Sequence, residues 1–133
     1  MAEKNKNTNQ PTFSVNIADT SRELTKIERV KFKDNGNAIK LDEAVSIDES
    51  IIIYPVMWVV LSIHNEKSED KDYSQYLVVD RDGKKYLTGS PSFWNGFMDI
   101  WTEMGGEEGW AIEIYKRESK NYKGKTFLAC SVF

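Results

Sequence analysis

The chain has 133 residues, a formal net charge of −3, an apolar fraction of 40% and an aromatic fraction of 12%. This length is typical of one domain, and the apolar content is sufficient for a hydrophobic core. The acidic balance excludes a general attraction to nucleic acid, so binding to a polyanion would require a local basic patch.

The N-terminal part of the chain is predicted to contain a disordered tail, one short strand and a β-hairpin. Residues 1–12 are polar and amide-rich, a composition typical of a disordered tail. A short strand is expected at residues 13–17, followed by a loop. The frequent β-branched residues in 24–32 and the turn at 34–37 predict a β-hairpin, with its return strand at residues 38–47.

Residues 51–63 form the longest apolar run, and their Ile and Val content predicts a buried strand. Pro55 lies within the run and predicts a bend or bulge. The run is also shorter than the ~20 residues that span a membrane as a helix, so no membrane association is expected. The next hairpin joins residues 73–79 to 84–89, because Asp82-Gly83 is a typical tight-turn sequence.

A helix is predicted after this hairpin, with Ser90 as its N-cap and Pro91 as its first residue. Gly105 and Gly106 end it. Its apolar stripe at helical spacing predicts core residues: Phe93, Phe97, Ile100, Trp101 and Met104. Trp94 is off this stripe, so it either packs on a neighbouring element or is exposed for a partner.

The chain closes with a hairpin of residues 109–119 and 125–133. From residue 51 the order is strand, strand, strand, helix, strand, strand, which is the order of an oligonucleotide-binding (OB) barrel. We therefore expect a mainly β domain over residues 13–133 with one helix. Its core would be an OB-like five-stranded barrel over about residues 51–133, and the N-terminal β-hairpin would be an extension.

Catalytic and metal sites have few candidate residues. His64 and Cys130 are single residues of their kind, and no zinc-ligand spacing is present. Cys130 alternates with apolar neighbours on a predicted strand, which indicates a packed thiol, and one cysteine favours a reducing, cytoplasmic setting. A magnesium-dependent nuclease is a remote alternative, since Glu118-Ser119-Lys120 has a Glu-x-Lys pattern that Asp99 or Asp82 would complete. We otherwise expect no catalysis, no metal and no cofactor.

Two hairpins combine cations with tyrosines, the residue types that neutralise phosphates and stack on bases. In the final hairpin, Tyr115 and Arg117 would share the face opposite the core. The earlier hairpin has its cations around the Asp-Gly turn, and together the two hairpins are expected to hold one strand. The candidate nucleic-acid-binding residues are Tyr76, Arg81, Lys84, Lys85, Tyr86, Tyr115, Lys116, Arg117, Lys120, Tyr122, Lys123 and Lys125.

The segment from Tyr86 to Val132 resembles small OB-fold proteins of phages and mobile elements of Gram-positive bacteria that bind single-stranded DNA. The likeness rests on the helix start Ser-Pro-Ser-Phe at residue 90 and on the turn Ser-Lys-Asn-Tyr-Lys-Gly-Lys at residue 119. It implies binding by the groove over the sheet, at the matching positions Tyr115, Lys116, Lys120, Tyr122, Lys123 and Lys125.

The residues and the resemblance together predict non-catalytic binding of single-stranded DNA or RNA. The alternative is a protein-interaction or structural module of a phage or mobile element, which would use edge strands or Trp94. The negative overall charge favours this alternative. Cations clustered on one face would favour nucleic acid.

Overall fold

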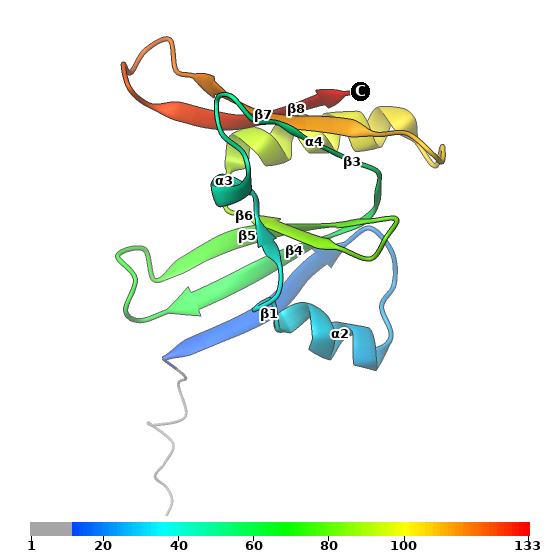
Figure 1. The fold of residues 1–133 in the computed structure, drawn as a ribbon. Helices are drawn as coiled ribbons and strands as arrows, with labels where there is room; N and C mark the ends of the chain where they lie inside the picture. The colour runs from blue at the N-terminus through cyan, green and yellow to red at the C-terminus, as the bar shows by residue number, and fades with distance from the viewer. Residues whose placement is uncertain (1–11) are drawn as a thin grey trace, which may run out of the picture.

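The computed structural model describes residues 12–133 (Figure 1). The predicted tail, residues 1–12, lies outside these residues apart from Thr12. In chain order the elements are β1 (Phe13–Thr20), α2 (Lys26–Lys33), β2 (Ile39–Lys40), α3 (Leu41–Ala44), β3 (Ile51–Ile53), β4 (Pro55–Asn65), β5 (Asp72–Asp80), β6 (Lys85–Thr88), α4 (Pro91–Met104), β7 (Ile112–Glu118) and β8 (Thr126–Val132).

The strands form two sheets, ordered β1-β4-β5-β6-β2 and β3-β7-β8. The domain is therefore mainly β, as predicted, but neither sheet closes into the expected barrel. The apolar run bends at Tyr54 and Pro55, so that β3 pairs with β7 while β4 pairs with β5. This confirms the bend predicted at Pro55, where the pairing also shifts register, because proline cannot donate a ladder hydrogen bond.

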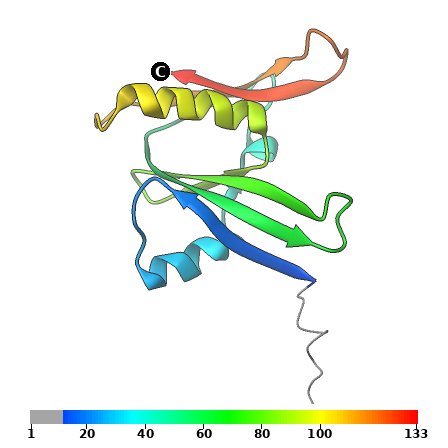
Figure 2. The same cartoon turned by 180° about the vertical axis from the view of Figure 1, so that it is seen from behind.

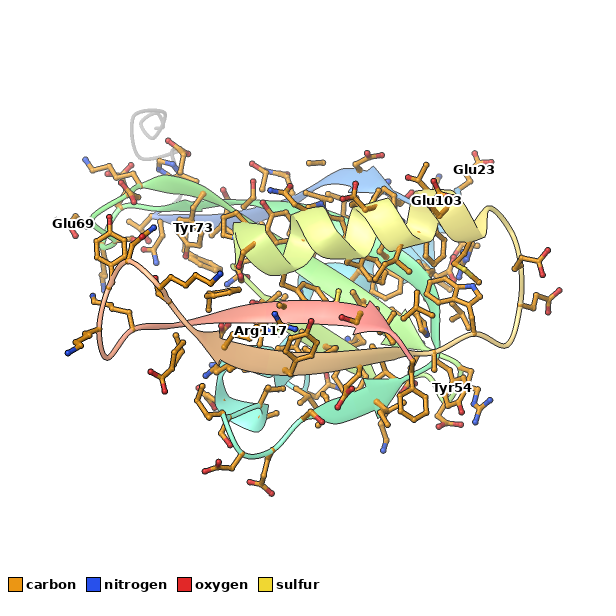
Figure 3. The ribbon with its side chains drawn as sticks, turned by 90° about the horizontal axis from the view of Figure 1, so that it is seen from above. Glu23, Tyr54, Glu69, Tyr73, Glu103 and Arg117 are labelled. Atoms are coloured by element: carbon orange, nitrogen blue, oxygen red, sulfur yellow. The ribbon has the colours of Figure 1, made fainter. Side chains whose placement is uncertain are left out.

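The two sheets are stacked, with α4 in the upper layer (Figures 1 and 2). Seen from above, α4, β8, β7 and β3 lie side by side over the five-stranded sheet (Figure 3). The Ser92 hydroxyl donates to the Leu128 carbonyl of β8 over 2.9 Å. The helix therefore lies along the edge of β8 that no strand within residues 12–133 pairs with, and α2 covers the opposite face of the five-stranded sheet (Figure 1).

Two hydrophobic clusters hold these layers together. The first lies between the layers and includes Trp58 from β4, Ile114 from β7, and Phe93 and Phe97 from α4, both fully buried. The second packs Phe32 of α2 against the other face of the five-stranded sheet. Both faces of β4 and β5 are therefore buried, which explains why their apolar residues run almost without interruption.

The ends of α4 follow the sequence prediction. The Ser90 hydroxyl accepts a hydrogen bond from the Phe93 amide over 3.2 Å, and Pro91 is the first helical residue. Gly105 ends the helix in the left-handed conformation at φ 47°, which glycine adopts at no steric cost. The Asp82-Gly83 turn is also confirmed, with Gly83 at φ 84°.

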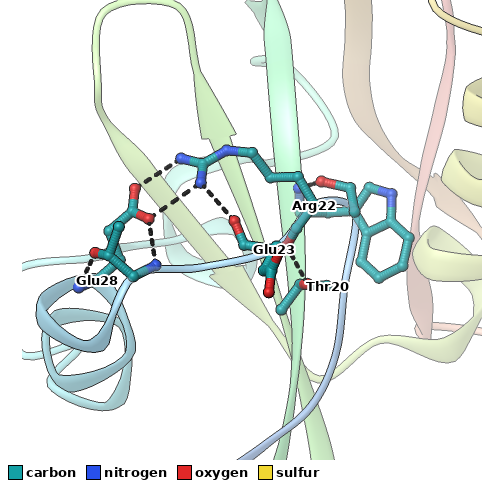
Figure 4. Close-up of polar contacts among 7 residues, drawn as sticks. Thr20, Arg22, Glu23 and Glu28 are labelled. Carbon is teal, nitrogen blue, oxygen red and sulfur yellow. Dashed lines mark hydrogen bonds and ion pairs between the residues drawn. The ribbon is translucent and has the colours of Figure 1, made fainter.

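The hairpin predicted over residues 24–47 is wrong, because this segment forms α2, the short strand β2 and α3. A capping box starts α2: the Thr25 hydroxyl accepts from the Glu28 amide, and the Glu28 carboxylate accepts from the Thr25 amide. Arg22 donates to both carboxylate oxygens of Glu28, which lowers the pKa of Glu28 to about 2 (Figure 4). These local bonds favour a helix despite the β-branched Ile27 and Val30.

Candidate nucleic-acid interface

The hairpin of β7 and β8 presents one face to the core and one to solvent. Ile112 and Ile114 are fully buried, whereas Tyr115 is half-buried and Arg117 is exposed. This confirms the predicted alternation, in which Tyr115 and Arg117 share the face opposite the core. The outer face of the β3-β7-β8 sheet therefore carries this pair, of which Arg117 is labelled in Figure 3.

Tyr115 and Arg117 contact each other on this face. The Arg117 guanidinium carbon lies 4.9 Å from the centre of the Tyr115 ring, and Nη2 donates to the tyrosine hydroxyl over 3.4 Å. The hydroxyl of Tyr115 also shares a 2.7 Å hydrogen bond with the Ser131 hydroxyl. These contacts hold a cation and an aromatic ring together in a defined orientation.

A shallow depression of about 450 Å³ adjoins the pair and contains both signs of charge. Lys116 and Arg117 line it together with Asp48 and Glu113. The Lys116 ammonium donates to the Asp42 carbonyl over 2.7 Å, and Ser50 donates to the Glu113 carboxylate over 2.6 Å. This depression is therefore close to neutral, and the basic character of the hairpin lies at its tip.

The tip, residues 119–125, carries three lysines and one tyrosine: Lys120, Lys123, Lys125 and Tyr122. All four side chains are exposed, and Tyr122 retains 66% of its accessible surface. Within residues 12–133 none of the three lysines forms an ion pair. The tip therefore offers uncompensated cations next to an aromatic ring.

The β5–β6 hairpin lies elsewhere. Its turn and the tip of β7–β8 are at opposite ends of the molecule (Figures 1 and 2). The expectation that both hairpins hold one strand is therefore wrong, because the stacked sheets direct their turns away from each other. The Arg81 guanidinium lies 3.6 Å from the centre of the Tyr54 ring, and the Lys85 ammonium donates to the Asp34 carbonyl over 3.3 Å. Lys84 is exposed.

The two tyrosines of this hairpin differ in exposure, since Tyr86 is buried and Tyr76 is half-buried. Tyr86 is 7% exposed, and its hydroxyl donates to the Asp80 carboxylate over 3.1 Å. Burial and the Asp80 charge raise the pKa of Tyr86 to about 12. The Tyr76 ring stacks on Trp94 with centroids 4.7 Å apart. The burial of Tyr86 leaves no ring face for a base, which corrects its assignment as a stacking residue, whereas Trp94 occupies one face of the half-buried Tyr76 ring.

Trp94 packs on neighbouring elements, one of the two alternatives from the sequence. Besides Tyr76, it contacts Trp58 edge-to-face at 5.4 Å and Phe97 at 5.4 Å. The aromatic contacts continue along α4 from Phe97 to Trp101 and then to Trp110. Sequence reasoning missed this aromatic row because its members come from β4, β5, α4 and the loop before β7.

His64 and Cys130, the remaining candidates for catalysis or metal binding, are held by hydrogen bonds or by burial. The His64 ring is hydrogen-bonded to Asp72 over 2.8 Å and Glu66 over 2.5 Å, and these bonds raise its pKa. Burial raises the pKa of the Cys130 thiol to about 12. Residues 12–133 contain no group of three His, Cys, Asp or Glu side chains placed to hold a metal ion.

No protein-family model matches this chain, and neither a curated protein nor a solved structure matches it significantly. In the part that the structure describes, none of the helices has the length and apolarity needed to cross a membrane. Functional proposals for the chain therefore rest on its own residues and geometry.

Proposed function

We propose that the chain binds single-stranded DNA or RNA, without catalysis, through the β7–β8 hairpin. The observation that carries the proposal is the tip itself, where three lysines without ion pairs among the described residues surround an exposed Tyr122. Lysines neutralise phosphates, and a tyrosine face stacks on any base, so the combination suits a flexible strand of mixed sequence. Arg117 and Tyr115 extend the surface along β7.

The connectivity supports an OB-type relationship. The bent run β3–β4 contributes to both sheets and is followed by β5, β6, α4, β7 and β8. We propose an OB barrel opened between β6 and β8, with α4 lying along the free edge of β8. In OB folds the loops after the first and fourth strands bind ligand. Here these are residues 66–71 and the tip, which lie at the same end (Figure 1).

Two features confine the ligand to the hairpin side. The outer face of β5 and β6, which OB proteins use for nucleic acid, is covered by α2, and Leu77 and Leu87 are buried there. The loop after β4, residues 66–71, carries three acids against Lys67 and Lys71, and Lys71 already pairs with Glu66, so the loop offers phosphates no net attraction. The strand should therefore run along β7 and the tip and avoid the acidic loop.

The test is fluorescence anisotropy of a labelled ~30-nucleotide single strand at low and moderate salt, with a duplex of the same sequence as the control. We expect salt-sensitive binding that prefers the single strand. Tyr122→Ala should weaken binding by about 1–3 kcal/mol, the usual contribution of one stacked base, whereas Tyr122→Phe should retain it. Absence of binding at low salt, or equal affinities for the two variants, would refute the proposal.

A protein-interaction module remains the second candidate because of one observation. On α2, Ile27 and Val30 are 68% and 70% exposed, so two aliphatic side chains lie in solvent on a helix. Contiguous exposed apolar residues mark contact surfaces more often than isolated ones do. The anisotropy test separates the candidates, since a protein-interaction module has no preference for single strands over duplex.

A further inference from the structure

The outward side of α2 combines apolar and basic residues. Phe32 points into the core, so helical periodicity places Val30 and Ile27 on the side facing away from the sheet. Exposed cations surround this pair: Lys26, Arg29, Lys31 and Lys33. The only acid of the helix, Glu28, is already paired with Arg22. We call Ile27, Val30 and these four cations the α2 crest.

A cleft of about 490 Å³ has the opposite chemistry. Trp101, Trp110 and Val56 supply its apolar walls, and Glu107 and Glu108 line it as well. The two indole rings meet edge-to-face at 5.9 Å, and the Trp110 indole N–H donates to the Glu107 carbonyl over 2.9 Å, which orders the loop. Tryptophan faces next to carboxylates attract cations.

Arg81, the cation among the lining residues, does not cancel the preference of the cleft for a positively charged partner. Arg81 lines the cleft, but its guanidinium lies over the Tyr54 ring at 3.6 Å. Two acidic residues therefore line the cleft against one arginine, whose guanidinium is already stacked on an aromatic ring. The cleft fits an apolar projection flanked by lysine or arginine side chains.

The α2 crest is such a projection, but it cannot enter the cleft of its own chain. α2 covers one face of the five-stranded sheet and α4 lies over the other face (Figures 1 and 2). The residues that line the cleft come from the end of α4, the loop after it, the start of β4 and the β5–β6 turn. We propose that the chain self-associates, with the α2 crest of one copy in the Trp101–Trp110 cleft of a second copy. Both charge and apolarity are complementary in this contact.

The chemistry of the crest distinguishes a second copy from other occupants. A membrane is a weaker choice, since two aliphatic side chains bury less apolar surface than one fatty acyl chain, which by itself gives only marginal binding. Nucleic acid bound to the crest would pair with its cations but would leave Ile27 and Val30 without an apolar partner. A second copy satisfies the apolar pair and the cations in one contact.

The test is sedimentation velocity of the full chain at low salt over a wide range of protein concentration. The weight-average mass should rise above 15.3 kDa with increasing concentration, to twice that value if two crest–cleft contacts close a dimer and beyond it if they form an open chain. A crest variant, Ile27→Glu with Val30→Glu, and a cleft variant, Glu107→Lys with Glu108→Lys, should each remain monomeric. The control Ile47→Glu, an exposed apolar position on another surface, should associate as the wild type does.

Mixing the two variants gives the decisive result. The crest variant retains an intact cleft and the cleft variant an intact crest, so their mixture should associate although neither does alone. Circular dichroism should show the native fold for each, because all substituted side chains are exposed. A wild type that stays monomeric, variants that associate normally, or a mixture that stays monomeric would each overturn the proposal. None of these measurements involves nucleic acid.

Discussion

Removing the charge of the tip should change the salt dependence of nucleic-acid binding by a predictable amount. Each phosphate that a lysine neutralises on a single strand contributes about −0.7 to the slope of log K against log salt. Replacing Lys120, Lys123 and Lys125 by Gln should therefore make the slope shallower by about 2. Between about 50 and 200 mM salt, the wild type should lose roughly 20-fold more affinity than the variant.

Anisotropy titrations at four or more salt concentrations measure this slope. The matched control replaces Lys40, Lys67 and Lys84, three exposed lysines outside both the tip and the α2 crest, by Gln. Both triple variants have a formal net charge of −6, since each removes three positive charges from a chain of −3. Only the position of the lost charge differs. Equal slopes for the two variants would show that net charge, and not the β7–β8 tip, controls binding, and would refute the reasoning.

Three further predictions concern stability and reactivity. Phe97→Ala should lower the free energy of unfolding by about 3–5 kcal/mol in urea denaturation, because the ring is fully buried between α4 and the sheets; a loss below about 1 kcal/mol would contradict this packing. Hydrogen bonds to Asp72 and Glu66 raise the pKa of His64 in the folded chain. Protonated His64 therefore stabilises the fold, and this contribution is fully present below the pKa of about 6.5 that histidine has in the unfolded chain. The contribution is lost as pH rises through the higher pKa of the folded chain. The difference in melting temperature between wild type and His64→Asn should accordingly shrink with rising pH, and a constant difference would exclude the linkage. The Cys130 thiol, whose pKa burial raises to about 12, should react with a disulfide reagent at about pH 8 only after unfolding, and rapid reaction of the folded chain would contradict its burial.

Sequence reasoning was most accurate where a local interaction decides the backbone. Ser90, Pro91 and Gly105 bound α4 because capping and the left-handed conformation depend on adjacent residues. Gly83 forms its turn for the same reason. The error over residues 24–33 came from weighting the β-branched residues above the capping box of Thr25 and Glu28. That capping signal was present in the sequence.

In the candidate site, too, the exposure of some residues follows from the local sequence, whereas the burial of Tyr86 does not. The exposure of Lys120, Tyr122 and Lys123 follows from their place in a turn, which has no core on either side. The burial of Tyr86 did not follow from its strand, because both faces of that sheet are covered. Alternation identifies an exposed face only where one face remains in solvent.

The sequence by itself determined the mainly β composition, the bounds of α4, the bend at Pro55 and the basic tip, because each depends on neighbouring residues. Tertiary structure alone decided that the strands form two open sheets, that α2 covers the outer face of β5 and β6, and that the turns of the two basic hairpins lie at opposite ends (Figure 1). These features depend on contacts between residues distant in the chain, such as Phe32 with the five-stranded sheet and Ser92 with Leu128. No local pattern encodes such distances.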